Sequence, residues 1–253
     1  MKIITRRVVL KLIVILSILF LAIGVLIYDG IIWFVYPEKL GYTVKGVDVA
    51  RYQGDIDWSM ISSQGIQFAF IKATEGSTYR DPFFNTNIVE SRKNDIYASA
   101  YHFFSSESPG KSQALNFISV VSEYDIDLPP VLDFEIPRDR ILEKEDIIRE
   151  SKEFLEELEM YFGIKPIIYT THESFNAFLL NEFDNYSLWF RDLLKEPKIV
   201  GDRDWLFWQY SNRGRLDGID KQQRYIDLNV FGGDLHEFNQ YINECHFMLL
   251  TPK

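Results

Sequence analysis

Cysteine and histidine are scarce in this sequence of 253 residues. It contains one cysteine, Cys245, and four histidines that are dispersed along the chain. A single thiol cannot form a disulfide framework, and a lone cysteine near the end of a chain is usually a small buried hydrophobic residue. The histidines show no metal-ligand spacing. We therefore expect a protein without internal disulfides and without a metal or other cofactor.

Positive charge is also in short supply. The chain has 27 lysine and arginine residues against 37 acidic residues, which gives a formal net charge of −10. The first forty residues carry +3, so subtraction leaves −13 for residues 41–253. The charged residues of that first segment are Lys2, Arg6, Arg7, Lys11, Asp29, Glu38 and Lys39. Because binding to a phosphate backbone needs a basic face, nucleic acid is not an expected partner.

Charge is absent from residues 12–28, which form a strongly apolar run. A helix of this length spans about 25 Å, close to the thickness of a bilayer core, and Lys11 can snorkel at one end. Arg6, Arg7 and Lys11 precede the run, and no basic residue follows it until Lys39. The positive-inside rule therefore predicts a cytoplasmic N-terminus.

A cleaved signal peptide is the alternative interpretation of this run, with Ala22 and Gly24 as the small-residue site. Cleavage there would leave apolar residues exposed at the new terminus, so an uncleaved anchor is preferred. Trp33, Phe34 and Tyr36 suit the outer membrane interface. We expect residues 1–40 to form a basic tip, a transmembrane anchor and a short stalk, and residues 41–253 to form an extracytoplasmic domain.

Short apolar strands alternate with amphipathic helices from residue 44 onward. Eight strands are predicted, at residues 44–49, 68–72, 98–104, 131–135, 166–170, 188–190, 206–210 and 225–230. Helices are predicted at residues 58–64, 83–93, 112–122, 143–162 and 172–180, with a terminal helix at 234–245. The alternation predicts an α/β fold whose parallel sheet closes into a TIM-like barrel. Because the last three connections are short or polar, we expect an incomplete ring of five helices (β8α5).

Two acidic residues end the fourth predicted strand. Side chains alternate along a strand, so Asp133 and Glu135 share one face while Phe134 points to the other. Burial and mutual repulsion oppose the ionisation of both acids. One acid can therefore hold a proton while the other stays charged, as acid-catalysed bond cleavage requires. The structural alternative is that the pair caps the next helix or binds a nearby arginine such as Arg138 or Arg140.

Polar and aromatic side chains also end the other predicted strands. In a parallel barrel the carboxyl ends of the strands meet at one rim, where the chemistry takes place. The residues at these ends are Asp48, Lys72, Glu75, Tyr101, His102, Tyr169, Trp208, Gln209, Tyr210 and Asp227. Because aromatic rings stack on sugars and polar groups bind hydroxyls, the pattern predicts a carbohydrate site. Trp208, Tyr210 and His102 also fit a structural place in the core, and Lys72 with Glu75 also fits a local ion pair.

Seven short segments, in order, resemble glycoside hydrolase family 25, the muramidases or Chalaropsis-type lysozymes. They are GVDVARYQG from Gly46, FIKATEG from Phe70, AYHF from Ala100, QALNF from Gln113, PVLDFE from Pro130, WQYS from Trp208 and IDLNVF from Ile226. The resemblance implies a barrel of eight strands and five helices, in agreement with the count above. It also implies cleavage of the β-1,4 bond between N-acetylmuramic acid and N-acetylglucosamine in bacterial peptidoglycan.

Carried over residue by residue, the resemblance implies roles for four acids. Glu135 is the implied general acid, and Asp133 is implied to orient the 2-acetamido group, whose oxygen can attack the anomeric carbon. Asp48 and Asp227 complete the implied catalytic set. Direct attack by water stays open as an alternative. Arg191 stands where the family usually has a small alanine, so we expect it to contact the substrate and to change the nearby sugar subsite.

An anchored enzyme of this kind would act on cell wall within its reach. The expected partners are therefore peptidoglycan and the membrane, with a role in remodelling or opening the wall for cell-envelope machinery. Two other functions stay open on the sequence alone. The domain could be a non-catalytic module that binds peptidoglycan, or a hydrolase of chitin-like N-acetylglucosamine polymers, since the same acidic pair suits the latter reaction.

Overall fold

The computed structural model describes residues 2–219, 223 and 225–250. The chain divides into two compact units, one ending at Phe34 and the other beginning at Val35. The first unit contains helix α1 (Lys2–Tyr28). Within α1, the segment Arg6–Tyr28 is long and apolar enough to cross a membrane, judged by length and composition, and it is not buried. A membrane anchor and a signal sequence both have these properties.

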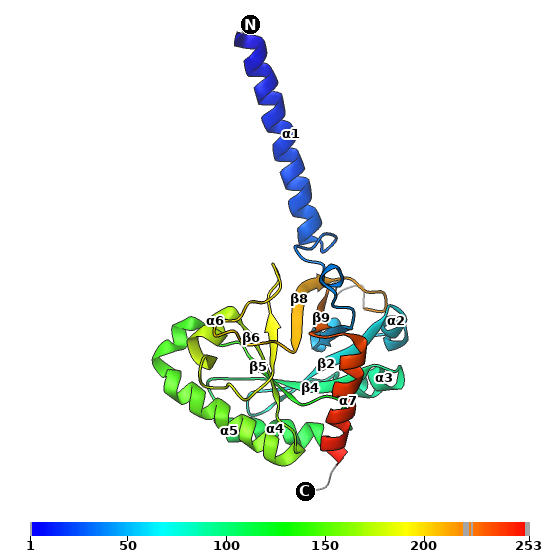
Figure 1. Ribbon diagram of the computed structural model, residues 1–253, viewed down its shortest axis with the longest axis vertical. Helices are drawn as coiled ribbons and strands as arrows, with labels where there is room; N and C mark the ends of the chain where they lie inside the picture. The colour runs from blue at the N-terminus through cyan, green and yellow to red at the C-terminus, as the bar shows by residue number, and fades with distance from the viewer. Residues whose placement is uncertain (1, 220–222, 224, 251–253) are drawn as a thin grey trace. The chain divides into compact units, whose positions relative to one another are not determined.

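The second unit is built around a closed sheet (Figure 1). Its barrel strands are β1 (Lys45–Val49), β2 (Ile66–Glu75), β4 (Tyr97–Phe103), β5 (Val131–Phe134), β6 (Ile167–Thr171), β7 (Leu188–Arg191), β8 (Phe207–Gly214) and β9 (Ile226–Phe231). β1 pairs with both β2 and β9, which closes the barrel. β3 (Tyr79–Arg80) only extends the end of β2 as a short hairpin. The predicted eight-stranded α/β barrel is thus confirmed.

One barrel strand departs from the predicted parallel arrangement. The pairs from β1 through β8 are parallel, but β9 runs antiparallel to both β1 and β8. A parallel crossover needs a dozen or more residues, and the link at residues 215–225 is shorter than that, so the chain turns back as a hairpin. The reversal brings the start of β9 to the rim, where Asp227 lies opposite Asp48 of β1.

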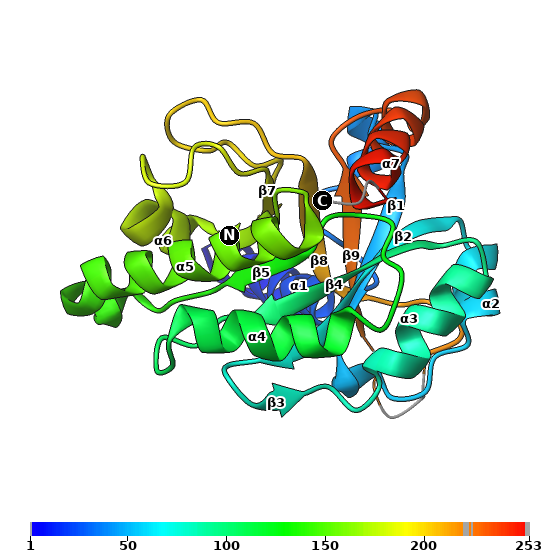
Figure 2. The same ribbon diagram turned by 90° about the horizontal axis from the view of Figure 1, so that it is seen from below.

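Five helical connections surround the described barrel, as predicted. They are α2 (Trp58–Ser63), α3 (Phe84–Lys93), α4 (Gly110–Val121), α5 (Lys144–Phe162) and the single turn α6 (His172–Ser174), which continues as a π-helical turn over Phe175–Leu179. Short 3₁₀ turns occur at Pro37–Leu40, Arg51–Gln53 and Arg138–Glu143. α4 and α5 lie side by side (Figure 2). This close packing requires glycine at position 110, because a β-carbon there would overlap the backbone of Glu150.

The terminal helix α7 (Leu235–Leu250) is longer than predicted and closes one end of the barrel. Its Phe238 packs against the rings of Phe68 and Tyr97, each with centroids 5.8 Å apart. These two residues lie near the start of β2 and β4, so α7 covers the amino-terminal end of the strands. Cys245 of the same helix is buried, as predicted.

Aromatic side chains fill the barrel above α7. Phe68, Phe70, Trp189 and Phe207 form a connected cluster, with ring centroids 4.5 to 5.7 Å apart. Gly46 of β1 makes room for it, because a β-carbon at this position would overlap the Phe68 ring. This apolar layer excludes water from the lower barrel and supports the polar layer at the opposite rim.

Candidate active site

A cavity of about 530 Å³ opens at the carboxyl ends of the parallel strands, and we call it the acidic cavity. Five acidic side chains line it: Asp48 on β1, Glu75 at the end of β2, Asp133 on β5, Glu135 directly after β5, and Asp227 on β9. Asp133 and Glu135 both reach the cavity, while Phe134 between them is fully buried in the layer outside the barrel. Strand alternation therefore places these acids as expected from the sequence.

Asp48 is held by two side-chain amides. Its Oδ2 accepts hydrogen bonds from Nδ2 of Asn229 at 2.8 Å and from Nε2 of Gln209 at 3.0 Å. Burial raises the pKa of Asp48 from 3.8 to about 6, and the two amide bonds oppose that rise. The pKa of Asp227 is also raised, because this side chain is buried and lies beside Asp48. These two acids therefore keep their protons to higher pH than free aspartates do.

Two aromatic side chains orient these amides. Nε1 of Trp189 donates to Oδ1 of Asn229 at 2.8 Å, and the hydroxyl of Tyr169 donates to Oε1 of Gln209 at 2.7 Å. Since each amide oxygen accepts from an aromatic residue, each amide nitrogen is left to donate to Asp48. The rings of Tyr169 and Trp189 lie 4.4 Å apart. The position of Asp48 is thus fixed by a network whose members lie on five strands, β1, β6, β7, β8 and β9.

Asp133 lies deeper in the acidic cavity and is only 8% exposed. Burial raises its pKa well above the ordinary value, and the charge of Glu135 raises it further, whereas Lys72 and Arg191 lower it. Its Oδ1 is buried and has no hydrogen-bond partner among the described residues. An unpartnered buried carboxylate oxygen is energetically unfavourable. This atom is therefore a ready acceptor for a donor on a bound ligand.

Glu135 forms an ion pair at the side of the cavity. Its Oε1 accepts a hydrogen bond from Nη1 of Arg191 at 2.7 Å. The two side chains are 29% and 36% exposed, respectively, so a ligand can reach both. Arg191 is the last residue of β7 and pairs with Thr171, the last residue of β6. Its guanidinium therefore lies at the same rim as the end of β5. Arg140, one of the two arginines considered as a structural partner, binds Glu143 and Glu107 instead.

The side chain of Arg138, the other arginine considered, lies outside the described part of the structure. Five of the residues predicted to bind substrate line the acidic cavity: Glu75, Tyr101, Tyr169, Arg191 and Gln209. Glu75 is also paired with Lys72, whose Nζ lies 2.6 Å from its Oε2. Glu75 therefore forms the local ion pair and also lines the cavity.

His102 is a correction to the predicted substrate contacts. It points out of the barrel, where its ring nitrogens lie 2.7 Å from Oγ1 of Thr74 and 3.0 Å from Oε1 of Gln113. Its ring stacks on Phe154 of α5, and complete burial lowers the pKa of His102 to about 3. Because Tyr101 faces the acidic cavity, alternation turns the next residue outward. His102 is therefore a neutral core residue, the structural alternative considered above.

Trp208 and Tyr210 are corrected for the same reason. Both flank Gln209, which faces the acidic cavity, so both side chains lie on the other face of β8. Trp208 is fully buried, and its Nε1 donates to the backbone oxygen of Asp192 at 2.8 Å. Its ring packs edge-on against Tyr210, with centroids 6.0 Å apart. These two aromatic residues support the wall of the barrel and do not line the cavity.

Some residues of the cavity were missing from the predicted site. They are Tyr52, Gln53, Phe103, Trp189 and Asn212. Trp189 had a usable signal, since it lies two residues before Arg191 and so shares its face of β7. Lys72, one of the predicted strand-end residues, also lines the cavity, because it continues the inward face of Phe68 and Phe70. No sequence pattern pointed to Asn212, because it follows an irregularity in the register of β8 and β9.

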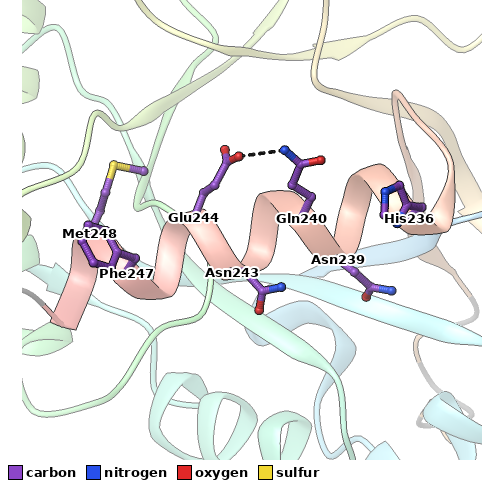
Figure 3. Close-up of a pocket in the computed structure, with 7 residues that line it drawn as sticks. All are labelled: His236, Asn239, Gln240, Asn243, Glu244, Phe247 and Met248. Carbon is purple, nitrogen blue, oxygen red and sulfur yellow. Dashed lines mark hydrogen bonds between the residues drawn. The ribbon is translucent and has the colours of Figure 1, made fainter.

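A larger, open hollow of about 740 Å³ lies along the outer face of α7 (Figure 3). Its polar residues include Glu244, which accepts a hydrogen bond from Gln240 at 3.2 Å, but no second acidic residue. A single helix face without converging polar groups is a poor catalytic site. Among the described residues, no group of three or more histidine, cysteine, aspartate or glutamate side chains could hold a metal ion.

Comparison with known proteins identifies a family. Residues 47–219 match the family described as glycosyl hydrolases family 25. The chain is 35% identical over 207 residues to the uncharacterized protein YegX of Escherichia coli (strain K12), covering 80% of this chain and 74% of that protein. It is 31% identical over 210 residues to lysozyme M1 of Streptomyces globisporus, covering 75% and 68%. A solved family 25 glycosyl hydrolase from Bacillus anthracis is 41% identical, with a TM-score of 0.72 over 79% of this chain and 94% of that one.

Proposed function

Because the chain belongs to glycosyl hydrolase family 25, we propose that it is an N-acetylmuramidase. Its reaction would be hydrolysis of the β-1,4 bond between N-acetylmuramic acid and N-acetylglucosamine in bacterial peptidoglycan. The observation that carries the proposal is the convergence of Glu135 with three buried aspartates, Asp48, Asp133 and Asp227, beside the rings of Tyr101, Tyr169 and Trp189. Burial raises the pKa of each of the three aspartates. Carboxyl groups cleave glycosidic bonds, and aromatic rings bind the apolar faces of sugars.

Glu135 is the proposed general acid. Its partly exposed carboxyl group at the side of the cavity can reach the bridging oxygen between two sugars, whereas Asp133 lies deeper. When the bond to the anomeric carbon breaks, the leaving oxygen becomes basic and needs a proton. Glu135 donates that proton and is left as a carboxylate, which can then activate the incoming water.

Asp133 is proposed to bind the 2-acetamido group. Its unpartnered Oδ1 accepts the amide hydrogen, which orients the acetamido oxygen toward the anomeric carbon. A negative charge on Asp133 also stabilises the positive charge that develops on the sugar in the transition state. Asp48 and Asp227 are proposed to extend this negative potential from below. The participation mechanism requires that the first-formed product retains its anomeric configuration, as seen by NMR.

The bond specificity is tested by the reducing ends of the products. Full-length protein in detergent is incubated with purified peptidoglycan, the fragments are reduced with borohydride, and the ends are identified by mass spectrometry. We expect muramitol ends. Glucosaminitol ends would contradict the proposal, because they place the cut at the other glycosidic bond. Binding without any release would instead identify a peptidoglycan-binding module, and cleavage confined to chitin oligomers would identify a chitin-type hydrolase.

We further propose that α1 anchors the enzyme in the cell membrane, with its basic end in the cytoplasm. The apolar segment Arg6–Tyr28 supports entry into the secretory pathway. Retention of the helix would confine hydrolysis to nearby cell wall, as remodelling for an envelope-spanning machine requires. We propose residues 1–40 as anchor and stalk and residues 41–253 as the catalytic domain.

Cell fractionation tests the anchor. The full-length chain should be found in the membrane fraction, should resist extraction by high salt, and should be released by detergent, because apolar burial is insensitive to salt. Its N-terminal sequence should include the residues before Leu12. Recovery from the culture medium with a new N-terminus after Gly24 would show that the helix is a cleaved signal peptide.

A further inference from the structure

The ion pair between Glu135 and Arg191 separates two cavities. One is the acidic cavity, and the other, which we call the side cavity, is lined by residues 135–137, 171–174 and 191–194 and has a volume of about 530 Å³. Glu135 and Arg191 are the only described residues that line both. Any change in the position of the Arg191 guanidinium therefore alters both the state of Glu135 and the connection between the cavities.

This pairing conflicts with the proposed role of Glu135. Nη1 of Arg191 donates to Oε1 of Glu135 at 2.7 Å, and a guanidinium at this distance attracts a charged carboxylate more strongly than a neutral carboxylic acid. A general acid must instead carry a proton on this group when the substrate is bound. Movement of Arg191 away from Glu135 would therefore favour the form of Glu135 that carries this proton.

The released guanidinium needs another anion, because a partly buried cation without a counter-charge is unfavourable. The carboxylates that the side cavity already contains are poor partners for it. The carboxylate of Asp192 already accepts from Nε2 of His172 at 3.0 Å and from the backbone nitrogen atoms of Leu194 and Lys195. Glu173 lies in the solvent, where charge interactions are weak. The side cavity is thus able to receive an external carboxylate beside Arg191.

We propose that Arg191 exchanges Glu135 for a carboxylate carried by the muramyl substituent of the substrate. This inference rests on the proposed muramidase function. In the free enzyme Arg191 is paired with Glu135. When the lactyl or peptide carboxylate enters the side cavity, Arg191 turns to it, and Glu135 is free to take up a proton. Apolar Ile136, Leu193 and Leu194 in the same cavity suit the methyl-bearing parts of that substituent. The enzyme would therefore select anionic glycans, because only these would release Glu135 from Arg191.

The test varies the charge of the substrate and of the enzyme together. Glycan fragments are used either with free carboxyl groups or after carbodiimide-mediated amidation, which removes their charge. Full-length wild type, Arg191→Met and Arg140→Met are compared in detergent by kcat and KM. Methionine keeps the aliphatic stem of arginine, and Arg140 is a matched control because its side chain is 38% exposed, against 36% for Arg191, and lies outside both cavities.

We expect the wild type to lose roughly tenfold or more in kcat/KM on the amidated substrate, the effect of one charge-assisted hydrogen bond. Arg191→Met should cleave both substrates at similar rates and should cleave the amidated one faster than the wild type does. Arg140→Met should discriminate as the wild type does. An active wild type whose discrimination is unchanged by Arg191→Met would overturn the exchange and leave the muramidase proposal intact. No muramitol release by any variant from either substrate would overturn the muramidase proposal itself.

Discussion

Glu135→Gln should lower kcat on peptidoglycan by roughly 10²- to 10⁴-fold, the range contributed by general acid catalysis. Glutamine has nearly the same shape but carries no acidic proton to give to the leaving oxygen. KM should change much less, because the aromatic residues and the other four acids still line the cavity. Steady-state release of reducing ends measures both constants.

Glu143→Gln is the matched control for this variant. Glu143 is half exposed, pairs with Arg140 and lies outside the acidic cavity, so its loss should leave kcat within about twofold. Retention of near wild-type kcat by Glu135→Gln would remove Glu135 from the mechanism. A matching fall in both variants would point to a general defect of the preparation.

Asp133→Asn should lower kcat by roughly 10²- to 10³-fold, comparable to the loss of a group that stabilises transition-state charge. Asparagine can still accept one hydrogen bond, but it lacks the negative charge opposite the developing positive charge. The same variant should unfold at a higher temperature at pH 7. In the wild type, the pKa of Asp133 is higher in the folded state than in the unfolded chain, so ionisation of Asp133 destabilises the fold as the pH rises. Asparagine removes this penalty.

Asp127→Asn separates these two effects. Asp127 is also buried, but it lies away from the acidic cavity and binds Arg92 and the backbone nitrogen of Ala98. Its replacement should lower the melting temperature without changing kcat, the reverse of the pattern at Asp133. Thermal unfolding and kinetics on the same samples provide the comparison. A stable Asp133→Asn variant with unchanged kcat would contradict the proposed role of Asp133.

The pH dependence of the wild type follows from the same acids. Burial raises the pKa of Asp48 to about 6 and raises that of Asp133 well above its ordinary value. Because the proposed mechanism uses their carboxylates, kcat/KM should fall on the acidic side, and the part of the fall due to Asp48 should lie near pH 6, about two units above the range of a free aspartate. In Asp133→Asn, the contribution of Asp133 to this fall should disappear.

The sequence by itself determined the barrel and most of its acidic site. Eight short apolar strands alternate with helices, and this periodicity specifies a closed sheet with few alternatives. The alternation of Asp133, Phe134 and Glu135 also specified which acids share a face. Such inferences depend on local geometry, which repeats every two residues in a strand and therefore can be followed along the chain.

The direction in which neighbouring residues face was less certain from the sequence. Tyr101 and His102 are both polar aromatic residues at a strand end, and either one could have faced the acidic cavity. The same holds for Gln209 and its neighbour Trp208. Only the register with adjacent strands decides between them, because a shift of one residue exchanges the two faces of a strand.

The tertiary structure alone decided two further features of this protein. The reversal of β9 brought Asp227 opposite Asp48, although a parallel strand would have carried its second residue toward the other end of the barrel. The bond between Arg191 and Glu135 joins residues that are 56 positions apart. Both features depend on contacts between distant segments, which form only when the barrel closes. No local pattern in the chain records them.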